Sequence, residues 1–334
     1  MLEINDLKIS IGVHQIVAIE RISIPAGRRL GLVGESGSGK TMTAMSIIGL
    51  LPREAVVTGS IKFQGVEMVD RSERNLSKLR GSEIGTIFQD PLRALNPTMR
   101  VGKQVGEALR LHNTVPKKKV KQRTVELLDQ VQLPDPDILS RRYPHQLSGG
   151  QRQRVLIAMA IACDPKLLIA DEPTTALDVT VQKEILELLA RLSDERDMAV
   201  LFVSHDLGVI QAISAHVAVL YGGSLVETGP TDQIVRSPRH RYTEALVSVN
   251  PGHPEDIAAA LGRPLVTIKG SVPPLGSFLP GCRFRGRCPH EVERCADQPP
   301  ISVATDEHTF KCWNPLDSAS LLPPGGAELA AGPQ

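Results

Sequence analysis

A run of eight residues near the start of the chain combines small, basic and hydroxyl side chains at a spacing that suits phosphate. The run is Gly34, Glu35, Ser36, Gly37, Ser38, Gly39, Lys40 and Thr41. Its glycines allow the backbone to curl so that successive N–H groups point at one anion. Lys40 adds a mobile positive charge for the β- and γ-phosphates, and the Thr41 hydroxyl can ligate Mg²⁺. The pattern predicts a phosphate-binding loop and therefore nucleotide binding.

The elements on either side of this loop suit the same chemistry. Residues 28–33 have the apolar content of a strand that enters the loop, and residues 41–51 have the apolar spacing of a helix stopped by Pro52. A phosphate in the loop would therefore meet the positive N-terminal end of a helix.

A second constellation lies far downstream. Ser148, Gly149, Gly150 and Gln151 place two glycines beside a serine at the expected start of a helix, which makes a second backbone site for an anion. The hydrophobic strand at residues 167–170 then ends in two acids, Asp171 and Glu172. The short glycine motif is weak evidence alone, but its position between the loop and the acids gives it weight.

Apolar periodicity divides the chain into alternating elements. Strands are predicted at residues 59–63, 84–88, 167–170 and 198–203, and helices at 101–111, 120–131 and 181–192. This alternation predicts an α/β protein whose parallel sheet is covered by helices, with an all-helical insertion. The 334 residues carry 41% hydrophobic residues and a net charge of +1, so a large core is feasible and no overall field favours nucleic acid.

The order of these motifs resembles that of the ATP-binding subunits of ABC transporters. The resemblance covers roughly residues 1–235 and implies a P-loop NTPase core with a parallel-rich sheet and a helical subdomain at about 90–150. It also implies ATP and Mg²⁺ as ligands. Each role below is carried over from the family onto the matching residue of this chain.

By this resemblance, one set of residues binds the metal and a different residue activates the attacking water. Asp171 should hold Mg²⁺ through water together with Thr41, and Glu172 should polarise the water that attacks the γ-phosphate. His205, in the sequence Ser-His-Asp after the strand at 198–203, resembles the histidine that touches the γ-phosphate. Gln89 resembles the hinge glutamine that joins the core to the helical insertion and senses Mg²⁺ and water.

The family also implies that each ATP site is shared between two subunits. The serine–glycine motif completes the site of a facing partner, and Asp178 resembles the residue that crosses the dimer and links the two sites. The resemblance implies a second ATP-binding subunit in either a homodimer or a heterodimer. Many relatives stack an aromatic ring on adenine, but this chain has none there, so Ile11, His14 or Ile16 is expected to pack against the base.

Further motifs resemble the subunits that power dipeptide and oligopeptide importers. They include residues 88–97, 171–180 and 240–243, where Arg241 replaces a proline of the family. The resemblance implies two membrane-embedded permease subunits, which dock near residues 89–100, and an extracytoplasmic solute-binding protein. The subunit would then act peripherally at the cytoplasmic face of the membrane. The cargo could instead be nickel, glutathione or an antimicrobial peptide, and a soluble ATPase of repair or translation is the second class.

Four cysteines crowd the region after residue 236, where periodicity is lost. They are Cys282, Cys288, Cys295 and Cys312. In a reducing cytoplasm such a group favours a metal site over disulfides. Their spacing is wider than that of typical zinc pairs, and relatives carry a four-iron cluster on this pattern, so a structural [4Fe-4S] cluster is expected, with zinc or free thiols as alternatives. Cys163, in an apolar helix, is expected to be inert.

Three parts are therefore expected. These are an ATPase domain at 1–235, a C-terminal extension with the cysteines at 236–313, and a disordered tail at 314–334 that is rich in Pro, Gly, Ala and Ser. No stretch approaches the length of an apolar membrane span, and the N-terminus lacks a signal peptide, which favours the cytoplasm.

Overall fold

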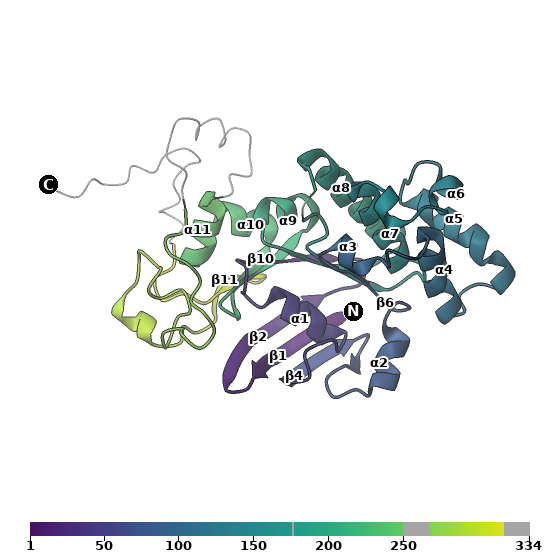
Figure 1. The fold of residues 1–334 in the computed structure, drawn as a ribbon. Coiled ribbons are helices and arrows are strands. Elements are labelled where there is room, and N and C mark those ends of the chain that lie inside the picture. Colours follow the sequence, from purple (N-terminus) through teal and green to yellow (C-terminus); the bar gives the residue numbers. More distant parts are fainter. Residues whose placement is uncertain (176, 250–266, 317–334) are drawn as a thin grey trace. The chain divides into compact units, whose positions relative to one another are not determined.

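The computed structural model describes residues 1–175, 177–249 and 267–316 (Figure 1). The chain divides into two compact units. Unit 1 comprises Met1–Gly31 and Lys40–Ser204, and unit 2 comprises Leu32–Gly39 and the described part of His205–Gln334. Strand β3 (Arg29–Val33) begins in unit 1 and ends in unit 2. In the part of the chain that is described, no helix is long and apolar enough to cross a membrane.

Unit 1 begins with a set of antiparallel strands. Its members are β1 (Leu2–Ile11), β2 (His14–Ile24), β4 (Ala55–Phe63) and β5 (Val66–Glu67). β1 pairs with β2 and with β4, and β4 pairs with β5. Alternate side chains of β1, such as Leu2 and Ile4, are buried, as expected for strands with one face on a core. A short helix, α2 (Glu73–Leu79), follows β5.

Three parallel strands form the second part of unit 1. They are β6 (Ile84–Ile87), β7 (Leu167–Asp171) and β8 (Ala199–Ser204), with β7 between the other two. β7 and β8 are buried along their whole length, because α1 (Lys40–Ile47) packs against both of them. The sequences of parallel strands that are covered on both faces are typically continuous apolar runs. Their carboxyl ends share one edge. Asp171 is the last residue of β7, Glu172 follows it directly, and Gln89 comes two residues after β6.

The residues between β6 and β7 form helices and turns only. The helices are α3 (Pro91–Ala94), α4 (Val101–Leu111), α5 (Val120–Gln130), α6 (Pro136–Leu139) and α7 (Gly149–Ala160), with single 3₁₀ turns at Lys117–Lys119 and Pro144–Gln146. α7 packs against α3, α4 and α5 and also against α8 (Val179–Glu195), so it connects this insertion to the rest of unit 1.

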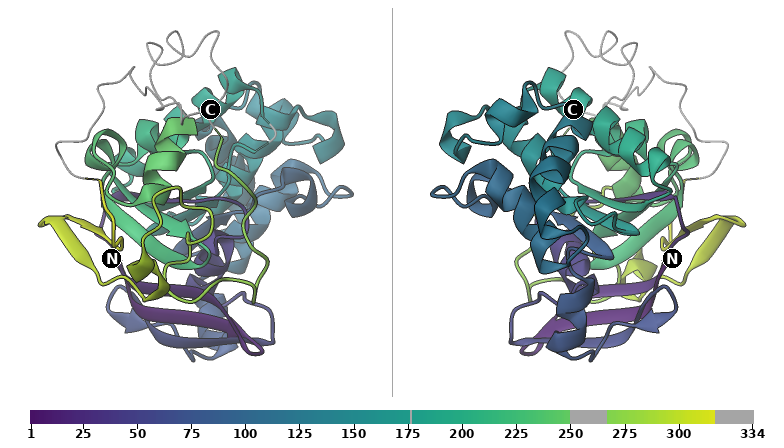
Figure 2. Two further views of the ribbon diagram at one scale, coloured as in Figure 1. Left: turned by 90° about the vertical axis from the view of Figure 1, so that its left-hand side faces the viewer. Right: turned by 90° about the vertical axis from the view of Figure 1, so that its right-hand side faces the viewer.

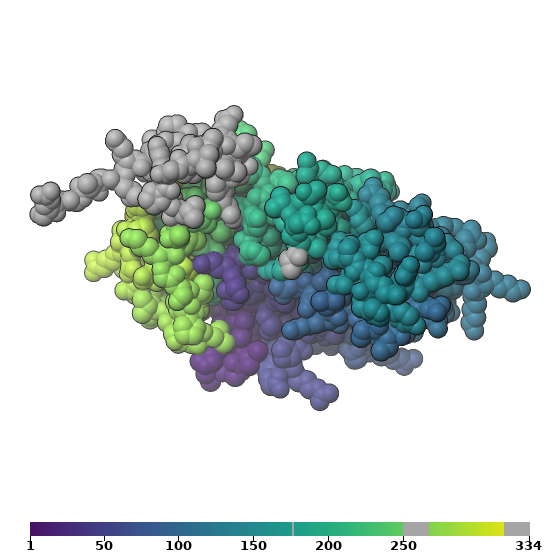
Figure 3. Space-filling view, turned by 45° about the horizontal axis from the view of Figure 1, so that its top comes forward, coloured from purple at the N-terminus to yellow at the C-terminus, as the bar shows by residue number. Residues whose placement is uncertain are grey.

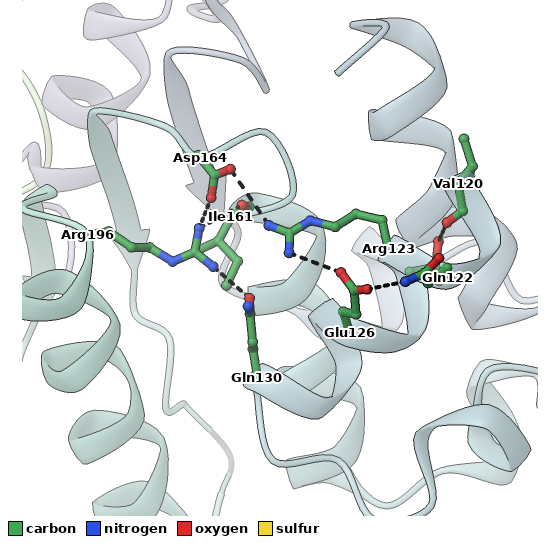
Figure 4. Close-up of polar contacts among 9 residues, drawn as sticks. Val120, Gln122, Arg123, Glu126, Gln130, Ile161, Asp164 and Arg196 are labelled. Atoms are coloured by element: carbon green, nitrogen blue, oxygen red, sulfur yellow. Dashed lines mark hydrogen bonds and ion pairs between the residues drawn. The ribbon is translucent and has the colours of Figure 1, made fainter. Parts of the chain in front are cut away.

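A polar network anchors α5 (Figure 4). The Arg196 guanidinium, just after α8, donates to the Asp164 carboxylate and to the Gln130 side-chain oxygen at 2.7 Å. Arg123 of α5 reaches the same Asp164 carboxylate at 3.7 Å. Because Asp164 lies in the turn before β7, one carboxylate joins the insertion, the parallel strands and the end of α8.

Unit 2 contains the remaining elements. They are α9 (Leu207–Ile213), β9 (His216–Tyr221), β10 (Ser224–Pro230), α10 (Thr231–Arg236), α11 (Arg241–Val249), a 3₁₀ turn at Glu293–Ala296, β11 (Ser302–Thr305) and β12 (His308–Phe310). β9 and β10 form an antiparallel hairpin, and β12 pairs with both β10 and β11. The β11–β12 hairpin is yellow in Figure 2.

The segment at residues 267–316, called here the C-terminal segment, is fastened to β10 by a buried acid. Glu227 of β10 accepts hydrogen bonds from the backbone N–H groups of Arg239 and His240, and its carboxylate lies 2.7 Å from His308 Nε2. Both side chains of the Glu227–His308 pair are almost fully buried. The yellow-green surface of this segment is visible in Figure 3.

The predicted α/β class is confirmed, and the pairings within the units are both parallel and antiparallel. The predicted helices at 101–111 and 120–131 correspond to α4 and α5, and the helix after the phosphate loop is shorter than predicted, ending at Ile47. The boundary at residue 235 stays a prediction. Most of the tail predicted as disordered at 314–334 lies outside the described residues.

Candidate functional site

The phosphate-binding loop enters unit 2 at the end of β3, and its glycines are placed where a side chain would interfere. A Cβ atom on Gly34 would lie 2.1 Å from the carbonyl oxygen of Leu220 in β9, which is far inside contact distance. Gly37 and Gly39 have φ values of 79° and 90°, a region that favours glycine. The loop can therefore adopt this curl only with glycine at these positions.

The buried hydroxyl of Ser38 is the clearest indication that the loop binds an anion. The Ser38 carbonyl accepts a hydrogen bond from the Gly223 N–H at 3.2 Å, which ties the loop to the β9–β10 turn. Its hydroxyl is buried and has no hydrogen-bond partner among the described residues. Buried hydroxyl groups normally have a hydrogen-bond partner, so a hydroxyl without one in this loop fits a phosphate-binding site.

In unit 1 the loop continues into α1, where Lys40 and Thr41 form the first turn. Lys40 is 5% exposed, and the Thr41 hydroxyl donates to Asp171 Oδ1 at 3.3 Å. Burial raises the pKa of the Asp171 carboxyl, the Thr41 hydrogen bond lowers it, and the nearby Glu172 raises it further. A carboxylate buried in this way gains from a cation, so the pair of Thr41 and Asp171 fits Mg²⁺.

Glu172 lies directly after β7 in a strained conformation. Its φ of 48° is unusual for a residue with a side chain, and its N–H donates to the Val203 carbonyl of β8 at 2.9 Å. The carboxylate accepts hydrogen bonds from Gln89 Nε2 at 3.0 Å and from Thr175 Oγ1 at 2.9 Å. The structure thus brings together two residues that the sequence analysis chose separately, and adds Thr175, which it missed.

The serine–glycine motif begins α7. The Ser148 hydroxyl accepts from the Gln151 N–H at 3.3 Å, and the Gln151 side chain accepts from the Ser148 N–H at 3.0 Å. This reciprocal pair is a capping box, which fixes the helix start. Ser148 and Gly149 are exposed, as a motif that serves a partner requires. A Cβ on Gly150 would lie 2.7 Å from Val181 of α8, so glycine permits the close approach of α7 and α8.

The remaining predicted residues are Asp178, His205 and the three candidates for the adenine contact. Asp178 is exposed and caps α8, with its carboxylate accepting from the Val181 N–H at 3.0 Å. His205 is exposed at the start of the second part of unit 2, and the next residue, Asp206, caps α9. In the β1–β2 turn region His14 is exposed, and Ile11 and Ile16 are half-buried, so the contact with adenine stays a prediction.

The four C-terminal cysteines have gathered without pairing. All of them are free thiols, and the Cys282 N–H donates to the Cys295 carbonyl at 3.0 Å. Burial raises the pKa of Cys288 to about 11, and negative charge on Cys312, Cys282 and Cys295 raises it further. Within the described ranges, however, no three His, Cys, Asp or Glu side chains form a group that could hold a metal ion. The iron–sulfur cluster is therefore not confirmed.

Cys163 behaves as the sequence predicts for an inert thiol. It is half-buried, and burial raises its pKa, which leaves little reactive thiolate at neutral pH.

Comparison with known proteins gives the same assignment as the motifs. Residues 17–175 match the ABC transporter family, and residues 226–295 match the oligopeptide/dipeptide transporter C-terminal region. A putative peptide import ATP-binding protein from Brucella abortus is 43% identical over 317 residues, with 93% of this chain and 94% of the relative covered. The chain belongs to the ABC transporter ATP-binding proteins. The oligopeptide transport ATP-binding protein OppD of Salmonella typhimurium is 41% identical over 321 residues, covering 95% and 94%.

A solved structure carries the same fold. It is a dimeric ATP-binding cassette in a post-hydrolysis state bound to ADP and phosphate, with a TM-score of 0.61 and 27% identity. The alignment covers 69% of this chain and 99% of the cassette.

Proposed function

We propose that this chain is the subunit that binds and hydrolyses ATP to power an ABC importer for peptides. The observation that carries the proposal is the contact between Thr41, at the end of the phosphate loop, and the buried Asp171 carboxylate. It joins the two motifs that an ATPase of this family needs, a loop for phosphates and an acid for the metal. The relatives named for peptide import, which align along nearly the whole chain, support the choice of cargo.

Each residue of the site has a proposed role. The loop N–H groups and Lys40 bind the phosphates, and Thr41, Asp171 and Gln89 hold Mg²⁺, which neutralises phosphate charge when bound. Glu172 accepts a proton from the attacking water, because its carboxylate is next to the metal acid but bonded to Gln89 and Thr175 instead. His205 contacts the γ-phosphate. This last role follows from the family alone.

We propose further that ATP binds between two such subunits. The exposed start of α7, with Ser148 and Gly149, would present backbone N–H groups to the γ-phosphate held by the partner's loop. ATP then stabilises the closed pair, and hydrolysis removes the shared γ-phosphate and lets the pair separate. The dimeric cassette among the solved structures supports this arrangement.

The wider assembly follows from the family. Two permease subunits would dock near residues 89–100, where Phe88 and Leu92 are exposed apolar side chains of unit 1. A solute-binding protein outside the membrane would deliver cargo, and this subunit would act at the cytoplasmic face. Nickel, glutathione and antimicrobial peptides are alternative cargoes. A soluble ATPase of repair or translation has less support, because the relatives that align along nearly the whole chain are named for peptide import or oligopeptide transport.

The [4Fe-4S] cluster belongs to the same proposal as a structural element. The support for it is that the four thiols are close enough to interact: burial is the main cause that raises the pKa of Cys288, Cys282 and Cys312, and neighbouring cysteines of the group raise each of them further. A bound metal would stabilise thiolates in such a group. Metal analysis of protein purified without oxygen tests it. Four iron atoms per chain are expected, whereas one zinc and no iron would overturn the assignment.

The proposed chemistry is tested with Glu172→Gln, which preserves size and the contact with Thr175 but removes the base. The variant is expected to bind ATP, accumulate as a closed dimer and lose nearly all turnover. Glu187→Gln is the matched control, because Glu187 lies exposed on α8 and its 3.9 Å ion pair with Lys183 contributes little. Turnover of Glu172→Gln at the level of the control would contradict the role of Glu172.

A further inference from the structure

Arg287 of the C-terminal segment contacts the phosphate-binding loop. Its guanidinium forms a bidentate pair with the loop residue Glu35, with Nη1 2.7 Å from Oε2 and Nη2 3.2 Å from Oε1. The two residues are 252 positions apart in the sequence but belong to the same unit. The Arg287 side chain is only 6% exposed and the Glu35 side chain is 27% exposed, so the guanidinium is largely shielded from water and the carboxylate is partly shielded.

Every N–H group of this guanidinium has a partner. Beyond Glu35, Nη1 donates to the Tyr221 hydroxyl at 3.1 Å, Nη2 donates to the Gly270 carbonyl at 3.2 Å, and Nε donates to the Lys269 carbonyl at 2.9 Å. Arginine has five donors in a rigid fork, and all five are used here. A lysine could supply the charge but not this geometry, so the position requires arginine.

The same loop residue is also held through its backbone. The Glu35 N–H donates to the Tyr242 hydroxyl at 2.9 Å. Tyr242 is fully buried and packs against Tyr221 and Phe284, with ring centroids 4.6 and 5.4 Å away. Because Phe284 and Arg287 come from the C-terminal segment, that segment and α11 together fix both the backbone and the side chain of Glu35.

We propose that Arg287 is a positioning residue for ATP binding: it holds the phosphate loop in its curled form and neutralises Glu35 there. Glu35 places a negative charge in a loop built for anions. Without the Arg287 guanidinium, that charge would repel the triphosphate more strongly, and the loop would lose this anchor to the C-terminal segment. The segment therefore contributes to nucleotide affinity through this one side chain, an inference that rests on the proposed function.

The test is the dissociation constant of the full-length chain for Mg·ATP, measured by calorimetry at low and physiological salt. Arg287→Met is expected to weaken binding about tenfold, which corresponds to losing about 1.4 kcal/mol. The double variant Arg287→Met with Glu35→Gln is expected to recover most of that loss, because it also removes the negative charge that Arg287 no longer neutralises. A merely structural role for Arg287 would give no such rescue.

Two further variants keep the test decisive. Arg285→Met is the matched control, because Arg285 pairs with Glu291 within the C-terminal segment. This variant is expected to bind Mg·ATP like the parent. Arg287→Lys keeps the charge and serves if the methionine variant fails to fold. It is expected to bind ATP more weakly than the parent and with stronger salt dependence.

The outcomes separate the two proposals. A parent chain that does not bind ATP would overturn the proposed function itself. A parent that binds ATP, with Arg287→Met and Arg287→Lys binding equally well, would overturn only the role of Arg287. So would a loss of affinity in Arg287→Met that the added Glu35→Gln leaves unchanged.

Discussion

His240 predicts an acid sensitivity that can be assigned to one side chain. It is 1% exposed, its Nδ1 accepts from the Tyr242 N–H at 3.0 Å, and its Nε2 has no partner among the described residues. Burial, with a smaller contribution from the nearby Lys311, lowers the pKa of His240 from 6.5 to about 3. Protonation would place a charged, unpaired N–H group among aromatic rings, so the folded chain keeps the neutral form.

The sign of the effect follows from proton counting. Below pH 6.5 the unfolded chain binds a proton at this histidine, whereas the folded chain does not until about pH 3. The unfolded state therefore binds more protons in this window, and stability falls as the pH falls. The slope is about 1.4 kcal/mol per pH unit once the pH is well below 6.5, and the total loss by pH 3 is about 5 kcal/mol at most.

The variant His240→Asn isolates this contribution, because its side-chain oxygen can accept from the Tyr242 N–H without titrating. Urea unfolding is followed by the fluorescence of Trp313, the only tryptophan of the chain, which lies in the C-terminal segment. The free energy of unfolding of the parent is expected to fall more steeply between pH 6 and pH 4 than that of the variant, by about 1 kcal/mol per unit. Equal slopes for the two proteins would refute the reasoning.

Two packing predictions concern unit 1. Gly150→Ala is expected to lower the free energy of unfolding by about 1–3 kcal/mol, because its Cβ would overlap the Val181 side chain. Gly149→Ala should lower it by less than about 0.5 kcal/mol, because its Cβ would lie 3.4 Å from the Leu177 side chain, an ordinary contact distance. Urea denaturation of the isolated chain checks both, and equal losses would contradict the overlap. Arg196→Met should cost about 1–3 kcal/mol and raise amide exchange in α5, since it removes the partly buried bond to Gln130 and the ion pair with Asp164. Arg141→Met is the control: it breaks the exposed ion pair with Asp137 and should lower the free energy of unfolding by less than about 1 kcal/mol. Similar amide exchange of α5 in the Arg196 and Arg141 variants would contradict the role of Arg196 in anchoring α5.

Periodicity predicted the elements that bury a regular face. α4 has the predicted bounds because its apolar residues recur at helical spacing, and β7 and β8 are continuous apolar runs. α2 gave no such signal, since Leu76 is its only buried residue. The strands of the C-terminal segment were also missed, because β12 has only three residues and depends on pairing with β10 rather than on its own sequence.

The site was predictable as a set of residues but not as a set of contacts. Motif order selected Gln89 and Glu172, yet the hydrogen bond between them depends on two neighbouring strands ending at one edge. Arg287 carries no local signal at all, because its partner Glu35 is in the loop at the opposite end of the chain and only the tertiary fold brings them together. A fork of five donors is visible only in three dimensions.

The central claim is that two subunits share each nucleotide, and the most direct measurement is ATP hydrolysis by the assembled transporter after Ser148→Arg in every cassette. Ser148 is exposed, and a bulky cation at the start of α7 would block its approach to a partner's γ-phosphate. Turnover is expected to fall to background while each chain still binds ATP through its own loop. Hydrolysis at the rate of the unmodified assembly would contradict the shared site.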